Sequence, residues 1–251
     1  MTETQTGTLI QQLSDSDEDV REGAGVQLIE MGESAVEALL EALTSNHAEA
    51  RYLAAWALGE IGDTRAVPPL IEALQDNEMR VQDWAARALG ELGDARAIKP
   101  LMYLLNSSDF PSTRRNAAAA LGWLQATEAV PALCEHLSDD DPDVRSAIAE
   151  ALGKLGDASA SSPLSEYVGD SDDWVRVAVV KSLGDIGDIS AEDAIISTLD
   201  DSNEWVRYHA ALALASVKSS KAGDLLTSRM NSDDSENVRR AISGALNILG
   251  Q

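Results

Sequence analysis

A pattern of apolar and polar positions about 31 residues long returns along this chain. One copy covers residues 143–157 and reads D-V-R-S-A-I-A-E-A-L-G-K-L-G-D. Counted from the arginine of each copy, positions +3, +6, +7 and +10 are Ala, Leu or Ile in most copies. Because residues three and four apart share one face of an α-helix, this spacing predicts a helix with one buried stripe.

The arginine gives each copy a fixed reference point, here called the ladder position. The eight ladder residues are Arg21, Arg51, Gln82, Arg114, Arg145, Arg176, Arg207 and Arg239. Gln82 is the one copy that lacks an arginine, and successive ladder residues are 30 to 32 positions apart. A fixed period of this size is typical of solenoids, in which each repeat buries its apolar faces against its neighbours.

Each copy is predicted to hold two helices. In the third copy the first helix follows Asp63, a polar turn lies at 76–78, and the second helix runs over 81–92 to Gly93. Gly-Asp pairs close the second helices and favour a left-handed helix end followed by a new N-cap. These pairs are Gly62–Asp63, Gly93–Asp94, Gly156–Asp157 and Gly187–Asp188.

The sequence therefore predicts an all-α fold, a right-handed α-α superhelix of eight two-helix repeats in a single domain over residues 1–251. The expected repeats are 1–32, 33–63, 64–94, 95–126, 127–157, 158–188, 189–219 and 220–251. The last repeats depart from the pattern, since Ala215 and Asn247 replace a mid-helix glycine and Lys218–Ser219 replaces a Gly-Asp pair. Terminal repeats are expected to be atypical because one of their faces has no neighbour.

The repeat resembles the short HEAT-type repeat that is named for phycobilisome lyases. The resemblance is carried by A-R-Y-L-A-A-W-A-L-G-E-I-G-D at 50–63 and by V-R-S-A-I-A-E-A-L-G-K-L-G-D at 144–157, and it extends over the whole chain. It implies a HEAT-like fold in which Asp and Arg residues tie stacked repeats together. We therefore expect the ladder arginines to bind the acidic turns rather than to form a row of anion-binding sites. A fold of this kind does not determine function.

Charge narrows the range of partners. The 43 acidic and 19 basic residues give a net charge of −24, and only 5 of the basic residues are lysines. Adaptation to high salt explains such a composition, because screened carboxylates keep a surface hydrated; an acidic surface that meets a basic partner is the alternative. Binding of a nucleic-acid backbone is not expected, since it needs clustered Lys and Arg.

Enzymatic, metal and membrane functions find little support in the sequence. We find no nucleophile elbow, phosphate loop or dinucleotide fingerprint, so no catalytic residue, cofactor or metal site is predicted. The histidines His47, His136 and His209 lie in different repeats, away from metal-ligand spacing. The single cysteine, Cys134, cannot form an internal disulfide. The sequence predicts neither a signal peptide nor a membrane-spanning helix. We expect a cytoplasmic monomer.

Residues that depart from the repeat pattern are the candidates for function. Positions +1, +2, +5 and +9 share a helix face outside the buried stripe, and in HEAT solenoids the second helices line the concave side. Large aromatic and arginine side chains gather on this face in the second to fourth repeats: Tyr52, Trp56, Trp84, Arg87, Arg115 and Trp123. Such residues anchor protein–protein interfaces. The alternative is that the rings cover neighbouring helices.

A second aromatic group lies farther along the chain. Trp174 and Trp205 stand two residues before the ladder position in adjacent repeats, with Tyr208 nearby. Their spacing of one repeat would allow the two tryptophans to stack along the ridge at the start of the second helices. Such a group serves either as a contact site or as a structural cover.

Together these observations predict a non-catalytic scaffold or adaptor that binds a protein partner on the second helices, with the two aromatic groups as contact sites. The alternative, which rests on the resemblance, is a bilin lyase-like subunit or another accessory subunit of an enzyme. A protein that mimics nucleic acid for a basic partner is a third hypothesis.

Overall fold

The computed structural model describes residues 3–250, and every regular element in that range is helical. The first helices of the hairpins are α1 (Glu3–Gln12), α3 (Val36–Ala42), α5 (Val67–Ala73), α7 (Ile98–Ser107), α9 (Val130–Glu135), α11 (Ser161–Ser165), α13 (Glu192–Ser197) and α15 (Ala222–Ser232). The second helices are α2 (Glu18–Met31), α4 (Ala48–Ile61), α6 (Met79–Leu92), α8 (Pro111–Trp123), α10 (Pro142–Leu155), α12 (Asp173–Ile186), α14 (Glu204–Ser216) and α16 (Glu236–Leu249). The predicted all-α, HEAT-like arrangement of helical hairpins is confirmed.

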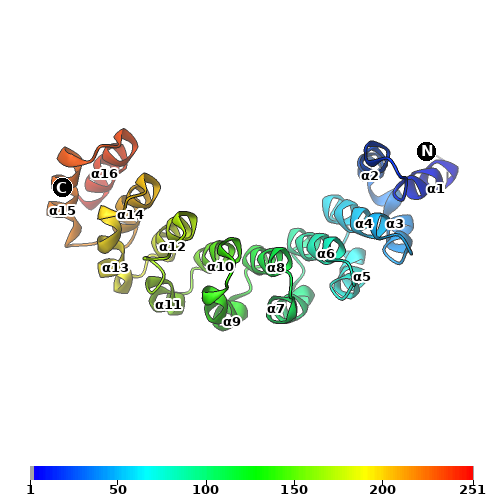
Figure 1. Ribbon diagram of the computed structural model, residues 1–251, viewed down its shortest axis with the longest axis horizontal. Coiled ribbons are helices and arrows are strands. Elements are labelled where there is room, and N and C mark those ends of the chain that lie inside the picture. The colour runs from blue at the N-terminus through cyan, green and yellow to red at the C-terminus, as the bar shows by residue number, and fades with distance from the viewer. Residues whose placement is uncertain (1–2, 251) are drawn as a thin grey trace. The chain divides into compact units, whose positions relative to one another are not determined.

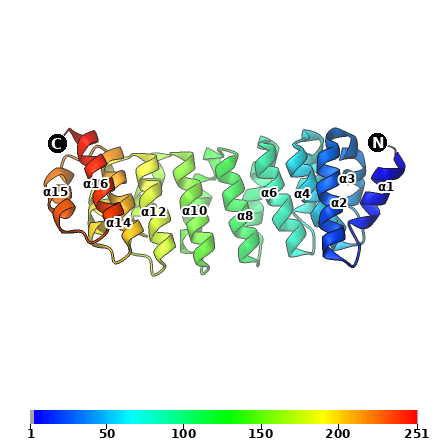
Figure 2. The same ribbon diagram turned by 90° about the horizontal axis from the view of Figure 1, so that it is seen from above.

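The helices group into two compact units, with the boundary between Leu124 and Gln125. Unit 1 contains α1–α8 and unit 2 contains α9–α16 (Figure 1). Within each unit the odd-numbered helices form one layer and the even-numbered helices form the other. The even-numbered helices of a unit pack side by side in chain order (Figure 2).

The first helices are shorter than the sequence pattern suggests, because most of them begin with a separate turn of 3-10 helix. These turns include η1 (Gly32–Ala35), η2 (Thr64–Ala66), η3 (Ala95–Ala97), η4 (Thr127–Ala129), η6 (Ala158–Ala160) and η7 (Ile189–Ala191). An aspartate precedes four of them and accepts a hydrogen bond from the backbone N–H two residues later, as Asp63 does from Arg65. The predicted capping role of the Gly-Asp aspartates is thus confirmed.

The glycines of the Gly-Asp pairs close the second helices in the left-handed conformation. Gly62, Gly93, Gly156 and Gly187 have φ between 65° and 78°. Where the chain has no glycine at this place, Gln125 and Lys218 adopt φ values of 53° and 55°. A side chain is strained in this region, so these two helix ends are held by their surroundings rather than by their own preference.

Arg51, Arg145, Arg176 and Arg207 join successive turns, as expected for the ladder arginines. Among the described residues, Arg21 bonds only to the carbonyls of its own turn, because Ser45 stands where the next turn would supply an aspartate. In unit 1, Arg51 donates from Nη1 to the carbonyl of Ser45 in its own turn. It also donates from Nε and Nη2 to the Asp76 carboxylate in the next turn, at 2.6 and 2.8 Å. Unit 2 repeats this arrangement three times. The pairs are Arg145 with Asp170, Arg176 with Asp201, and Arg207 with Asp233.

Glycines within the second helices set how closely neighbouring helices approach. A Cβ placed on Gly59 would lie 2.8 Å from Ala88 Cβ, and one on Gly184 would lie 2.8 Å from Ala213 Cβ. These distances are shorter than a normal van der Waals contact, so the helices touch backbone to side chain at these points. The buried stripe around them is confirmed at positions +3, +6 and +7, which are buried in most repeats of both units. Position +10 is only half-buried in most repeats.

Candidate functional site

The sequence predicts that positions +1, +2, +5 and +9 of the second helices form an exposed face, but the exposed face is narrower than that. Positions +5 and +9 carry most of its exposed side chains, among them Arg87, Glu150 and Lys181. Positions +1 and +2 lie toward the neighbouring second helix and are half-buried or buried in most repeats. Tyr52 and Leu53 are only 5% and 3% exposed. The expectation that Tyr52 lies on a free surface is therefore wrong.

Tyr52 is covered by the first turn of the next second helix. The Arg80 guanidinium carbon lies 4.0 Å from the centroid of the Tyr52 ring, which is a cation–π distance. The ring thus fills space between α4 and α6. This covering role was the alternative considered for the aromatic residues, and sequence spacing alone did not distinguish it from exposure.

Trp56 and Trp84 come together on adjacent helices of unit 1. Their ring centroids are 6.1 Å apart with an interplanar angle of 52°, a distance at which aromatic pairs attract. A Cβ on Gly25 would lie 2.9 Å from Trp56 Cζ3, so the Trp56 ring rests on the preceding helix where a glycine leaves room. Both tryptophans are half-buried.

Arg87 and Arg115 border a shallow pocket beside Trp84. The pocket has a volume of about 220 Å³ and is lined by Asp83, Trp84, Arg87, Arg115 and Asn116. The Arg87 guanidinium lies 5.3 Å from the Trp84 ring centroid and donates from Nε to Glu91 at 2.8 Å. The Asp83 carboxylate accepts a hydrogen bond from the Thr113 hydroxyl at 2.6 Å. An aromatic ring, two guanidinium groups and a carboxamide therefore share one opening.

Trp123 lies on the same layer, on α8. It is 42% exposed, and a Cβ on Gly90 would lie 2.7 Å from Trp123 Cε3. One face of the ring thus rests on a glycine of the preceding helix while the rest meets solvent. Of the six residues singled out in unit 1, five remain at least partly accessible: Trp56, Trp84, Arg87, Arg115 and Trp123.

The aromatic group of unit 2 is arranged differently from the prediction. Trp174 and Trp205 are 64% and 40% exposed, but the two rings do not stack on each other. Trp205 instead meets the Tyr208 ring edge-on at 5.7 Å, and Tyr208 meets His209 at 5.2 Å. The predicted stack is wrong because residue spacing carries no information on rotamers. The ring that Trp205 meets is three positions on, along its own helix.

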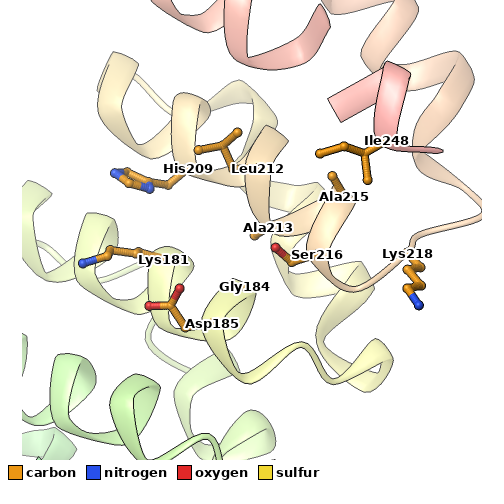
Figure 3. Close-up of a pocket in the computed structure, with 10 residues that line it drawn as sticks. All are labelled: Lys181, Gly184, Asp185, His209, Leu212, Ala213, Ala215, Ser216, Lys218 and Ile248. Atoms are coloured by element: carbon orange, nitrogen blue, oxygen red, sulfur yellow. The ribbon is translucent and has the colours of Figure 1, made fainter. Parts of the chain in front are cut away.

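A larger pocket in unit 2 was not predicted from the sequence. It has a volume of about 580 Å³ and is formed by α12, α14 and α16. Figure 3 shows Lys181, Asp185 and His209 at one end of it and Ile248 and Lys218 at the other. The residues at +5 and +9 of these helices are ordinary one by one, and the repeat pattern carries no signal of the pocket that they enclose.

The polar end of this pocket favours a neutral imidazole. Burial lowers the pKa of His209, and the positive charge of Lys181 lowers it further, while Asp185 opposes both effects. Among the described residues, no group of three or more His, Cys, Asp or Glu side chains gathers in a way that could hold a metal ion. Within the same range no helix is long and apolar enough to cross a membrane.

Comparison with solved structures gives similar folds over nearly the full length. A chain in the complex of CpcE and CpcF of phycocyanin lyase from Nostoc sp. PCC7120 is 26% identical, with 97% of this chain and 94% of that chain covered and a TM-score of 0.55. The Escherichia coli protein YibA is 20% identical, with 94% and 88% covered and a TM-score of 0.65. An engineered protein is 22% identical, with 98% and 81% covered and a TM-score of 0.56.

A search of curated proteins gave no significant match. The family model described as HEAT repeats matches four overlapping segments, residues 6–78, 36–110, 98–180 and 163–247. These segments span nearly the whole chain and contain the ladder arginines and the paired helices described above. The chain belongs to the HEAT-repeat family.

Proposed function

We propose that this protein is a non-catalytic scaffold that holds a protein partner on the second helices of unit 1. The contact residues in this proposal are Trp56, Trp84, Arg87, Arg115 and Trp123. The observation that carries the proposal is the pocket in which Trp84, Arg87 and Arg115 meet. Tryptophan and arginine in a partly desolvated pocket are the residue types that dominate binding energy at protein interfaces.

The rest of the surface supports the same interpretation. An accessible aromatic cluster is unusual on a chain with a net charge of −24 and only ten aromatic residues. Trp174, Trp205 and Tyr208 form a second accessible group in unit 2 and are proposed as a separate contact site. Because the two groups belong to different units, each is tested by its own variants.

The test is partner capture from a lysate of the native host at its own salt concentration, read by mass spectrometry. Trp84→Ala combined with Trp123→Ala is expected to abolish capture, and Arg87→Ala to weaken it. Glu150→Ala, at the +5 position of a repeat without aromatics, is the matched control and should capture as the wild type does. Trp174→Ala with Trp205→Ala tests the second group.

Helical circular dichroism and thermal melting accompany each variant. The proposal requires that the double tryptophan variant keeps its helical signal and melts within a few degrees of the wild type. If it unfolds instead, the rings are core residues and the proposed contact surface does not exist. If it folds and still captures the same proteins as the wild type, the binding site lies elsewhere.

The similarity to a phycocyanin lyase chain favours a second candidate, an accessory subunit of a chromophore lyase. This candidate predicts that the protein binds a tetrapyrrole. A visible absorption band in protein purified from the native host, or after incubation with a bilin, would support it. A scaffold without chromophore chemistry shows no such band, so one spectrum separates the two candidates.

A further inference from the structure

Between the third and fourth repeats, both residues of the expected Arg–Asp ion pair are replaced. Gln82 stands where seven repeats have an arginine. In the turn of the fourth repeat, Ser108 stands where the Arg51, Arg145, Arg176 and Arg207 pairs have an aspartate partner. Both substitutions fall at the same joint, so the guanidinium and the carboxylate that bridge the joints of those four arginines are replaced together by shorter neutral groups.

Gln82 reproduces only half of the ladder contact. Its Nε2 donates to the Asp76 carbonyl at 2.6 Å, which is the bond that a ladder arginine makes to its own turn. This bond fixes the orientation of the amide, so Oε1 points the other way. Gln82 Oε1 is buried and accepts no hydrogen bond from the protein. A buried acceptor without a donor is unfavourable, and a donor brought by another molecule would relieve it.

A pocket of about 260 Å³ opens at this joint. Its polar groups come from Gln75, Gln82, Ser107, Ser108 and Asp109. Tyr103, Leu104 and Phe110 supply much of its apolar wall. Tyr103 and Phe110 are 59% and 41% exposed, so both rings are accessible at this pocket. An apolar cavity of about 150 Å³ is enough to hold benzene, so this pocket has room for a planar guanidinium.

We propose that this pocket binds an arginine side chain of a basic partner protein, which takes the place that the chain's own arginine occupies at other joints. A guanidinium offers several N–H donors in one plane, for Gln82 Oε1 and for the Asp109 carboxylate. It also stacks on aromatic faces, which Tyr103 and Phe110 provide. The net charge of −24 draws a basic segment toward the surface, and the pocket then selects arginine from other cations.

The arginine pocket is independent of the contact surface proposed above. It lies between the inter-helix turns of the third and fourth repeats and contains none of the residues assigned to the second-helix face. Partner capture through Trp84 and Trp123 can therefore fail while arginine binding succeeds, or the reverse.

The test is a titration of the full-length ¹⁵N-labelled protein at constant ionic strength with N-acetyl-arginine amide. Saturable chemical-shift changes are expected at the Gln82 side-chain amide and at the backbone amides of Ser108 and Phe110, with a dissociation constant on the order of millimolar. N-acetyl-lysine amide should bind several-fold more weakly. N-acetyl-citrulline amide, which has the shape without the charge, should cause little change.

Gln82→Arg places the missing guanidinium inside the chain and should remove the arginine-induced shifts while the protein stays folded. Gln27→Arg adds the same charge at an exposed position of α2 and should leave the dissociation constant unchanged. Tyr103→Leu should weaken binding several-fold. Three results would each overturn the proposal. The first is chemical-shift changes that do not saturate and spread over the acidic turns, and the second is equal binding of the lysine and arginine amides. The third is wild-type affinity for the arginine amide in a folded Gln82→Arg variant.

Discussion

At the scale of single residues, the Arg145–Asp170 pair shows how a ladder arginine is held. The Arg145 guanidinium contacts both carboxylate oxygens of Asp170 at 2.8 Å, and the two side chains are only 12% and 7% exposed. Burial by itself raises the pKa of Asp170. Hydrogen bonds from Arg145 and from the Asp172 backbone outweigh this effect, so the pKa lies below its ordinary value.

Replacement of Asp170 by asparagine is predicted to lower the free energy of unfolding by about 2 kcal/mol at pH 7, because a charge-assisted hydrogen-bonded pair is lost. The folded pKa of Asp170 is below the unfolded value of about 3.9, so the pair stabilises fully above that pH. Its contribution is lost as the pH falls through the folded pKa. Urea unfolding at pH 7, 5, 4 and 3 should show the difference between variant and wild type shrinking in acid.

Asp234→Asn is the matched control for this measurement. The Asp234 carboxylate lies 2.7 Å from Arg207 NH2, but its side chain is 92% exposed. Exposed pairs contribute little, and we expect a change within about 0.5 kcal/mol. If Asp234→Asn and Asp170→Asn cost the same, burial does not set the strength of the ladder.

The role of a residue could be predicted from the sequence only where its hydrogen-bond partner recurs at a fixed place in the repeat. Arg51, Arg145, Arg176 and Arg207 bind the turns as expected because an aspartate recurs 25 or 26 residues after each of them. Tyr52 was placed on the wrong surface because its burial depends on Arg80 in the next repeat. Arg80 stands two residues before the ladder position, where the residue type varies so widely that no such cover could be expected. Trp205 was paired with the wrong ring for a similar reason, since rotamers decide that contact.

At the scale of elements, close approach between second helices depends on a glycine at position +8. On α12, a Cβ at Gly184 would lie 2.8 Å from Ala213 Cβ and 2.9 Å from Ala213 Cα. Backbone atoms cannot move aside as the end of a flexible side chain can. In α14 the same position is Ala215, which shows that the spacing is set separately for each helix pair.

Gly184→Ala is predicted to destabilise unit 2 by about 1–3 kcal/mol, the usual cost of an overpacked core. This loss should exceed the gain of roughly 1 kcal/mol that alanine brings within a helix. Gly244→Ala is the control: Gly244 lies within α16 and is exposed, and a Cβ placed on it would meet no other atom within 4 Å. That variant should melt slightly higher than the wild type. Thermal unfolding followed by circular dichroism compares the two, and equal stabilisation would refute the packing argument.

The helices themselves were largely predictable, and their details less so. Second helices end at the expected Gly-Asp pairs because a left-handed glycine and an N-capping aspartate are local signals. The 3-10 turns before the first helices were missed. Their sequences, such as T-R-A at 64–66, carry no signal that separates a 3-10 turn from the first turn of an α-helix. The pockets were also missed, since each arises where side chains from separate elements meet.

At the scale of the whole molecule, charge is the dominant property. With a net charge of −24, the acidic side chains repel one another at low salt. The Debye length falls from about 10 Å in 0.1 M salt to about 3 Å in 1 M salt, so added salt should weaken this repulsion. The ladder pairs are partly buried and are screened less. The melting temperature is therefore predicted to rise by several degrees between 0.1 and 1 M NaCl.

The same comparison at pH 5, where some carboxylates are protonated, should give a smaller rise. A melting temperature that falls with added salt would show that exposed ion pairs, rather than repulsion, dominate the surface. The measurement also bears on the acidic composition, for which salt adaptation and recognition of a basic partner are the two explanations. The repeat pattern is sufficient to predict the fold and the family. It does not predict the partner, because a partner is recognised by residues that differ from one repeat to the next.

The short reach of the ladder has a consequence for how such a chain changes over generations. Arg51, Arg145, Arg176 and Arg207 each bond to their own turn and to a carboxylate 25 or 26 residues ahead, so these bonds are completed within one period. A tandem duplication or a deletion of one period within such a run leaves each remaining arginine with a turn to bond. The gene can therefore gain or lose repeats without redesign, and single copies are then free to acquire substitutions such as Gln82.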